Sequence, residues 1–415
     1  MKSAIGVLAG LALAMPASAL AASKAMPKDA KVWAAALAAR DGQLKLWEQV
    51  VDIDSGTGDV EGGREVAAIL APQLKALSFE IESVPAEAPG LPENTVATLK
   101  GPGKARILLI GHIDTVFGPG TVARWPFRTD ADKAYGPGVG DEKGGVVEAV
   151  TALKIVHDLG FKDFKSITFL METSEERGSP GTLALIGRLL ADADVELNLE
   201  PGDPPDVLTV WRKGSTTFHI AVKGRAAHAG MAPQEGRNAA VELIHQLQTD
   251  AVFPTSGDGL TANLTLMSAG SRENIIPDAA SASINVRVRE LADFDKVRGV
   301  LEKNAAATAV PDTTVSVSTE RAYPPLPLNP ATDALAARAE AIYAGIGLTI
   351  ARGGNGGASE SALAAAAGVP ALDGLGPAGG GFHSDSEYVL LNTVTPRLYL
   401  LTKLIIDLGK APPAR

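Results

Sequence analysis

Apolar residues recur along the first half of the chain with two different spacings. Apolar positions at helical spacing predict helices over residues 27–49, 61–78, 144–159 and 181–191. Short runs that are apolar throughout predict buried strands over residues 94–100, 106–112, 166–172 and 195–200. Strands of this kind alternating with helices are typical of an α/β domain whose sheet is covered on both faces.

The spacing changes after residue 213. Residues 215–223 (STTFHIAVK) alternate between apolar and polar, as a strand with one solvated face does. A helix, two strands, a helix and a strand are then predicted over residues 237–249, 261–268, 280–289, 292–308 and 313–319. This β-α-β-β-α-β order is that of the ferredoxin-like α+β motif.

The α/β pattern returns after a proline-rich segment, YPPLPLNP, at residues 323–330. The remaining sequence predicts helices and strands over residues 331–345, 347–351, 359–367, 370–372 and 393–408. We therefore expect an α/β domain built from residues 23–213 and 323–415, interrupted by an inserted α+β domain of residues 214–322.

The N-terminal residues 1–22 (MKSAIGVLAGLALAMPASALAA) have the pattern of a secretory signal peptide. One lysine is followed by an apolar run and then by small residues. No other run reaches the roughly 18 apolar residues that a membrane-spanning helix needs. We therefore expect a periplasmic or secreted protein that has no membrane contact after processing.

Composition narrows the chemistry that the chain can perform. The 48 acidic residues exceed the 38 lysines and arginines, giving a net charge of −10, which argues against nucleic acid as a partner. The absence of cysteine excludes thiolate metal sites and cysteine nucleophiles. Any metal must therefore be held by carboxylates and by some of the six histidines.

Acidic and imidazole side chains lie at or just after the ends of three of the predicted buried strands. They are His112 and Asp114, Glu175 and Glu176, and Glu200. The carboxyl ends of parallel strands meet at one edge of a sheet, where ligands bind in α/β folds. Two further candidates are Asp141, in GPGVGDEKGG, and His383, in GGGFHSDSEY.

Carboxylates gathered at one sheet edge repel one another unless cations neutralise them. Two histidines and three carboxylates suit a pair of zinc ions, with cobalt or manganese as substitutes. A further carboxylate is needed as general base for an attacking water. The adjacent Glu175 and Glu176 can supply a base and a ligand, because successive residues of an extended segment point in opposite directions.

Seven segments together resemble one known enzyme family. They are GHIDTV, GPGVGDEKGG, ETSEERGS, LEPG, GRAAHAG, NIIPDAA and GFHSDSEYV. The chain resembles, over about residues 46–408, the co-catalytic zinc peptidase family of aminoacylase, succinyl-diaminopimelate desuccinylase and glutamate carboxypeptidase. Within that family it is most similar to the bacterial, exported glutamate carboxypeptidases of the folate-cleaving type.

The resemblance implies a zinc-exopeptidase-like, three-layer catalytic domain with two zinc ions. It implies that His112 and Glu200 hold one zinc, that Glu176 and His383 hold the other, and that Asp141 bridges the two. It implies further that Glu175 is the general base and that Asp114 orients His112. It also implies that the Asp141–Glu142 peptide bond is cis.

For the inserted domain the resemblance implies a lid that also forms a homodimer. His228, in GRAAHAG, would stabilise the oxyanion, either within its own chain or from the partner subunit. Arg289 would hold the substrate carboxylate, with Asn274 nearby. Ser359 aligns with a glycine-rich loop that binds the same group.

The expected activity is hydrolysis of an amide or peptide bond, releasing a C-terminal amino acid from an N-acylated or peptide substrate. Glutamate or a similar residue is expected, but TVWRKGS and GGNGGASES depart from the glutamate-specific pattern. Lys213 or Arg321 could pair with an acidic side chain, or both could be ordinary surface charges. The alternatives are an amidohydrolase or dipeptidase with another preference, a periplasmic solute-binding protein and a TIM-barrel metal hydrolase.

Overall fold

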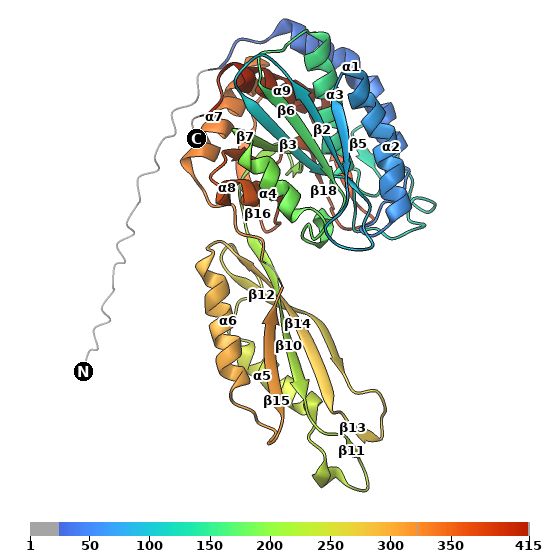
Figure 1. Ribbon diagram of the computed structural model, residues 1–415, viewed down its shortest axis with the longest axis vertical. Coiled ribbons are helices and arrows are strands. Elements are labelled where there is room, and N and C mark those ends of the chain that lie inside the picture. The colour runs from blue at the N-terminus through green and yellow to red at the C-terminus, as the bar shows by residue number, and fades with distance from the viewer. Residues whose placement is uncertain (1–24, 321, 414–415) are drawn as a thin grey trace, which may run out of the picture.

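The computed structural model describes residues 25–320 and 322–413, which form a larger main domain and a smaller inserted domain (Figure 1). The expected signal peptide, residues 1–22, and Arg321 lie outside the described residues. The chain leaves the main domain once, forms the inserted domain, and returns to complete the main domain.

A six-stranded sheet forms the centre of the main domain. Its strands lie in the order β1 (Glu80–Val84), β2 (Asn94–Lys100), β6 (Ser166–Glu172), β3 (Arg106–His112), β7 (Val195–Asn198) and β17 (Ala371–Leu372). The strands from β6 to β17 run parallel, whereas β1 and β2 pair antiparallel. The bounds predicted for β2, β3 and β6 are confirmed, because these apolar runs are the buried centre of the sheet.

Helices cover both faces of this sheet, giving three layers (Figure 1). Ile107 and Leu109 of β3 face a core that includes residues from α1 (Ala30–Val51), α2 (Val60–Ala76), α3 (Lys143–Asp158), α7 (Pro330–Gly345) and α9 (Leu391–Lys410). Leu108 and Ile110 face a second core with α4 (Leu183–Ala191) and α8 (Glu360–Ala366). The alternation of side chains along a strand explains why β3 is apolar at every one of these positions.

The main domain also contains short strands that apolar spacing did not predict. They are β4 (Arg128–Thr129), β5 (Lys133–Tyr135), β8 (Pro201–Gly202), β9 (Val207–Arg212), β18 (Gly376–Gly380) and β19 (Tyr388–Leu390). The strand predicted over residues 347–351 was wrong in position, since β16 spans Ala351–Asn355. Gly347, with φ of 78°, and Leu348 instead close the end of α7, where the Leu348 N–H donates to the Tyr343 carbonyl.

The inserted domain has the expected ferredoxin-like order. Its elements are β10 (Gly214–Lys223), α5 (Ala239–Asp250), β12 (Thr261–Ala269), β14 (Ala279–Val288), α6 (Ala292–Ala305) and β15 (Thr314–Thr319). The strands form an antiparallel sheet in the order β12-β14-β10-β15. Phe218, Ile220 and Val222 alternate along β10 and build a core separate from that of the main domain.

Two short strands lie at the end of the inserted domain that is far from the main domain. They are β11 (Ala227–His228) and β13 (Ile275–Ile276), which pair antiparallel (Figure 1). Across residues 25–320 and 322–413, no helix combines the length and the apolar character that crossing a bilayer requires.

Candidate active site

The five predicted metal ligands converge at the carboxyl edge of the six-stranded sheet. His112 is the last residue of β3, Glu200 follows β7, and Glu176 lies in η1 (Glu175–Arg177), just after β6. The parallel register that pairs β3 with β6 and β7 brings these three strand ends together. Asp141, before α3, and His383, between β18 and β19, complete the group.

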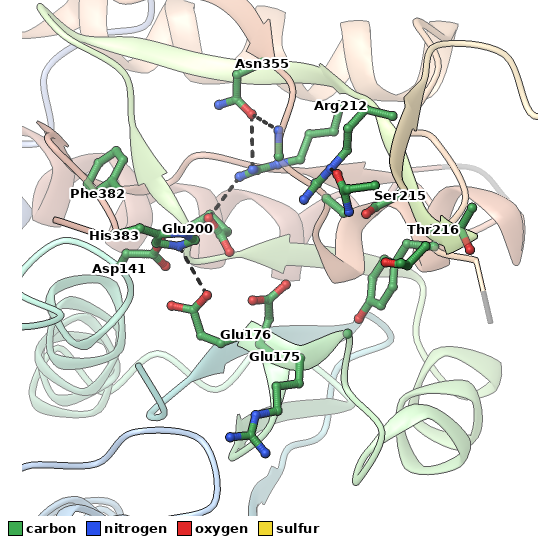
Figure 2. A pocket seen from close by; sticks show the side chains of 18 of the residues that line it. Asp141, Glu175, Glu176, Glu200, Arg212, Ser215, Thr216, Asn355, Phe382 and His383 are labelled. Atoms are coloured by element: carbon green, nitrogen blue, oxygen red, sulfur yellow. Dashed lines mark hydrogen bonds and ion pairs between the residues drawn. The ribbon is translucent and has the colours of Figure 1, made fainter. Parts of the chain in front are cut away.

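Asp141 lies between the two histidines. Its Oδ1 is 3.1 Å from Nε2 of His112, and its Oδ2 is 3.1 Å from Nε2 of His383. The outer ligands are also close, because Glu200 Oε1 is 3.7 Å from the His112 Nε2 and Glu176 Oε2 is 3.2 Å from the His383 Nε2. Asp141 thus directs one oxygen to each half of the site, and Figure 2 shows Glu176 beside His383.

The donor atoms fit divalent metal ions. His112, Asp141 and Glu176 form one group whose ligand atoms all lie within 4.8 Å of one another, and His112, Glu142 and Glu200 form another. Within the described part of the chain, the buried Oε1 of Glu176 has no hydrogen-bond partner. Unpaired buried carboxylate oxygens are costly unless a cation or a proton satisfies them. Imidazole and carboxylate donors in this combination suit zinc.

Glu142 belongs to this site although the sequence reasoning did not select it as a ligand. It is fully buried, and its Oε2 accepts a hydrogen bond of 2.9 Å from the His112 backbone N–H. Its position next to Asp141 in the glycine-rich loop is the signal that could have identified it. The peptide bond between Asp141 and Glu142 is cis, as the family resemblance implied.

Burial and crowding shift the pKa values of the predicted ligands. Burial raises the pKa of Glu176 to about 7, and the nearby charge of Asp141 adds to the rise. Hydrogen bonds to Asp141 and Glu176 raise the pKa of His383 to about 10. In the absence of metal, protons on Glu176 and His383 therefore offset part of the negative charge of the site, and divalent cations would replace these protons.

The carboxylate of Asp114 organises two parts of the site. Its Oδ1 is 3.5 Å from Nδ1 of His112, and that ring nitrogen is also 3.0 Å from the Asp114 backbone carbonyl. The same carboxylate accepts hydrogen bonds from the backbone N–H groups of Glu175 and Glu176. Asp114 therefore contacts the His112 ring and in addition anchors the turn after β6.

The segment containing Glu175 and Glu176 is not extended, so that expectation was wrong. Residues Glu175–Arg177 form a 3₁₀ turn, which ends at Gly178 in the left-handed region with φ of 80°. The two N–H groups bound by Asp114 and the left-handed glycine favour this turn over a strand. The side chains still diverge, with Glu176 at His383 and Oε2 of Glu175 at 3.9 Å from the His112 Nε2.

A cleft of about 1010 Å³ opens over these residues and is lined by both domains. Arg287, on β14, lines it, and its guanidinium contacts the Asn285 side chain and the Gly356 carbonyl. The predicted Arg289 instead lies over the Trp211 ring, with its guanidinium carbon 3.7 Å from the ring centre. Lys213 is buried and donates to the Gly257 carbonyl.

Three other candidates for substrate contacts also lie away from the cleft lining. His228, in β11, and Asn274, directly before β13, are both exposed, and the Ala229 N–H donates to the Asn274 carbonyl. These two strands lie at the far end of the inserted domain (Figure 1). Ser359 is fully buried, and its hydroxyl donates to the carboxylate of Asp373. Gly357 and Ala358, which directly precede Ser359 in the chain, line the cleft in its place.

Comparison with known proteins identifies the family. Residues 108–407 match the model described as "Peptidase family M20/M25/M40". The chain is also 35% identical over 388 residues to carboxypeptidase G2 of Pseudomonas sp. (strain RS-16), covering 93% of this chain and 94% of that protein. The chain belongs to peptidase family M20/M25/M40.

Solved peptidase structures share the fold. The dipeptidase Dug1p of Saccharomyces cerevisiae superposes with a TM-score of 0.73 at 15% identity, covering 92% of this chain and 99% of that one. The M20 family metallo-carboxypeptidase Sso-CP2 of Sulfolobus solfataricus gives 0.70 at 15% identity, covering 88% and 99%. The protein is thus a metallopeptidase, which excludes the solute-binding protein and the TIM-barrel hydrolase.

Proposed function

We propose that the protein is a dinuclear zinc hydrolase that releases a C-terminal amino acid, glutamate or a similar residue, from peptides or N-acylated amino acids. The observation that carries this proposal is Asp141, whose two oxygens each lie 3.1 Å from a different histidine. One carboxylate between two imidazoles, with a further carboxylate on each side, is a donor set for two cations. An amidohydrolase or dipeptidase with another side-chain preference is the alternative.

His112 and Glu200 would hold one zinc, Glu176 and His383 the other, with Asp141 shared. When bound, zinc polarises the scissile carbonyl and lowers the pKa of water. Glu175 is the base: burial raises its pKa well above the usual carboxyl range, and the nearby Glu360 raises it further. Its carboxylate accepts the proton of the attacking water and returns that proton to the leaving nitrogen.

We infer that Arg287, rather than Arg289, binds the substrate carboxylate. Arg287 lines the cleft, and among the described residues it makes no ion pair. Burial lowers the pKa of Arg287, so its charge is poorly solvated and a carboxylate partner would relieve this cost. A guanidinium can bind a carboxylate through two parallel hydrogen bonds.

A screen of N-acyl amino acids and dipeptides in the presence of zinc tests this function. We expect release of the C-terminal amino acid, with kcat/KM about 10-fold to 100-fold lower when the terminal carboxylate is amidated. In Arg287→Met this preference for the free acid should largely disappear. Arg289→Met is the matched comparison. If that variant alone loses the preference for the free acid, Arg289 is the residue that binds the substrate carboxylate. Hydrolysis of amidated and free substrates at equal rates would reject a carboxypeptidase.

We further propose a homodimer formed through β12. This strand is at the edge of its sheet, and its last seven residues are exposed. They include Leu264, Leu266 and Met267, whose exposed fractions are 51%, 69% and 49%. An exposed apolar edge strand is suited to pairing with another strand, here that of a second copy. Such a dimer would let His228 act at the partner's cleft, since it is remote from its own.

Light scattering tests the dimer. The wild-type protein should have the mass of two chains, and Leu266→Asp should give single chains because a charge is buried without a partner at the interface. Its kcat should fall at least as far as that of His228→Ala. Leu37→Asp, with a similarly exposed leucine on α1, is the control and should stay dimeric. A wild-type protein of single-chain mass at micromolar concentration rejects both the dimer and the role of His228 in trans.

The pattern of residues 1–22 supports export. Fractionation of the producing cells, with N-terminal sequencing of the processed protein, distinguishes periplasm from medium and would reject export if the full-length chain is found in the cytoplasm.

A further inference from the structure

Arg212 is a buried cation at the wall of the cleft, next to a proposed metal ligand. It is the last residue of β9, and only 4% of it is exposed. In the sequence, Arg212 belongs to TVWRKGS, a segment that departs from the glutamate-specific pattern, and no role was predicted for it. In Figure 2 its side chain extends toward Glu200 from the strand above the site.

The two oxygens of the Glu200 carboxylate have different surroundings. Oε2 accepts a hydrogen bond of 3.2 Å from Nη2 of Arg212. Oε1 lies 3.7 Å from the His112 Nε2, on the side of the metal ligands. Arg212 thus binds Oε2 of Glu200, while Oε1 remains directed at the metal site.

Arg212 is itself held rigidly by Asp373. The Arg212 Nε donates to Oδ2 of Asp373 at 2.6 Å, and Nη2 donates to Oδ1 at 2.8 Å. The fully buried Asp373 also accepts hydrogen bonds from the hydroxyls of Ser359 and Ser361. This two-point contact restricts the guanidinium to one orientation.

The guanidinium has few donors left for a ligand. Nη1 of Arg212 lies 3.4 Å from the Asn355 side-chain oxygen, and its charge already faces two carboxylates, those of Asp373 and Glu200. A substrate carboxylate would have to compete with both. This distinguishes Arg212 from Arg287, which lines the same cleft without an ion pair among the described residues.

We propose that Arg212, held by Asp373, is a positioning residue that fixes Glu200 with one oxygen facing the metal site, and that it does not bind the substrate. The inference rests on the proposed function, in which Glu200 is a zinc ligand. Partners that orient metal ligands from outside typically contribute 10-fold to 100-fold in metal affinity. Without Arg212, Glu200 is free to rotate and Asp373 is left buried without its counter-ion.

Zinc binding in metal buffers, followed by metal analysis of the dialysed protein, tests the proposal on the full chain. The wild-type protein should bind two zinc ions. Arg212→Met should bind one of them about 10-fold to 100-fold more weakly and the other normally. Arg212→Lys keeps the charge but not the two-point contact, so its zinc affinity should lie between those of the wild type and Arg212→Met. Asp373→Asn should resemble Arg212→Lys, since the guanidinium loses its charged anchor.

Kinetics separate positioning from substrate binding. At limiting zinc the Arg212 variants should have a lower kcat at nearly unchanged KM, and added zinc should restore kcat. A raised KM that zinc does not restore, with normal zinc affinity, would make Arg212 a substrate contact and overturn the proposal.

Arg106→Lys is the matched control. Arg106 forms a two-point contact with Asp194 at the start of β3, the opposite end of the strand from His112. This variant should keep wild-type zinc affinity. Folded Arg212 variants that bind both zinc ions as tightly as the wild type overturn the positioning role and leave the proposed function intact. A wild-type protein that binds no zinc refutes the proposed function itself.

Discussion

Glu175→Gln should lower kcat by about 10²-fold to 10⁴-fold, because the reaction loses its general base. The amide has nearly the same shape as the carboxylate but cannot accept the proton of the attacking water. The backbone contact that anchors this turn, from the Glu175 N–H to Asp114, does not involve the changed atoms. Steady-state kinetics together with metal analysis measure the effect, and both zinc ions should remain bound.

Glu176→Gln is the matched control for this substitution. The change is the same and affects the neighbouring residue, but Glu176 lies 3.2 Å from the His383 Nε2 as a proposed ligand. That variant should therefore lose affinity for one zinc as well as activity. If Glu175→Gln keeps the wild-type kcat with both metals bound, another group is the base and the proposed role of Glu175 is wrong.

Removal of zinc by a chelator should abolish activity and also lower the melting temperature. Several carboxylates share the site within a few ångströms, and without cations they must be protonated or repel one another. A ligand that binds only the folded protein stabilises it by about 2.7 kcal/mol when its concentration is 100 times Kd. Thermal unfolding and activity, measured across a series of free zinc concentrations, should rise together.

Glu175→Gln separates the two consequences of zinc binding. That variant should show the same rise in melting temperature on adding zinc, but no comparable recovery of activity. Full activity of the chelated wild-type protein, with no metal left by elemental analysis, would contradict the metal mechanism.

The strands that carry the site were predictable from local sequence. β3 and β6 are apolar throughout because both faces of the central sheet are covered by helices. Their predicted bounds match the structure, and polar residues at or just after their ends, such as His112 and Glu175, line the site. The strands β18 and β16 were missed or misplaced, because their glycine-rich sequences have no apolar spacing to indicate a strand.

Local sequence did not predict which polar residues line the cleft. Arg287 and Arg289 are two residues apart in one segment, and only the packing of the inserted domain decides that the first lines the cleft and the second lies on Trp211. Likewise, the turn at Glu175 depends on the carboxylate of Asp114, which is 61 residues away in the chain.

The residue pattern alone therefore decides the fold class and indicates several candidate ligands, since both depend on which short segments must be buried and on the polar residues at the ends of those segments. Tertiary structure decides how the ligands are aimed. Arg212 binds Asp373, which is 161 residues away in the chain, and Glu200, which is 12 residues away. Together these two contacts orient the Glu200 carboxylate. Burial is a local property of each strand, whereas the partner of a buried charge depends on how distant segments pack.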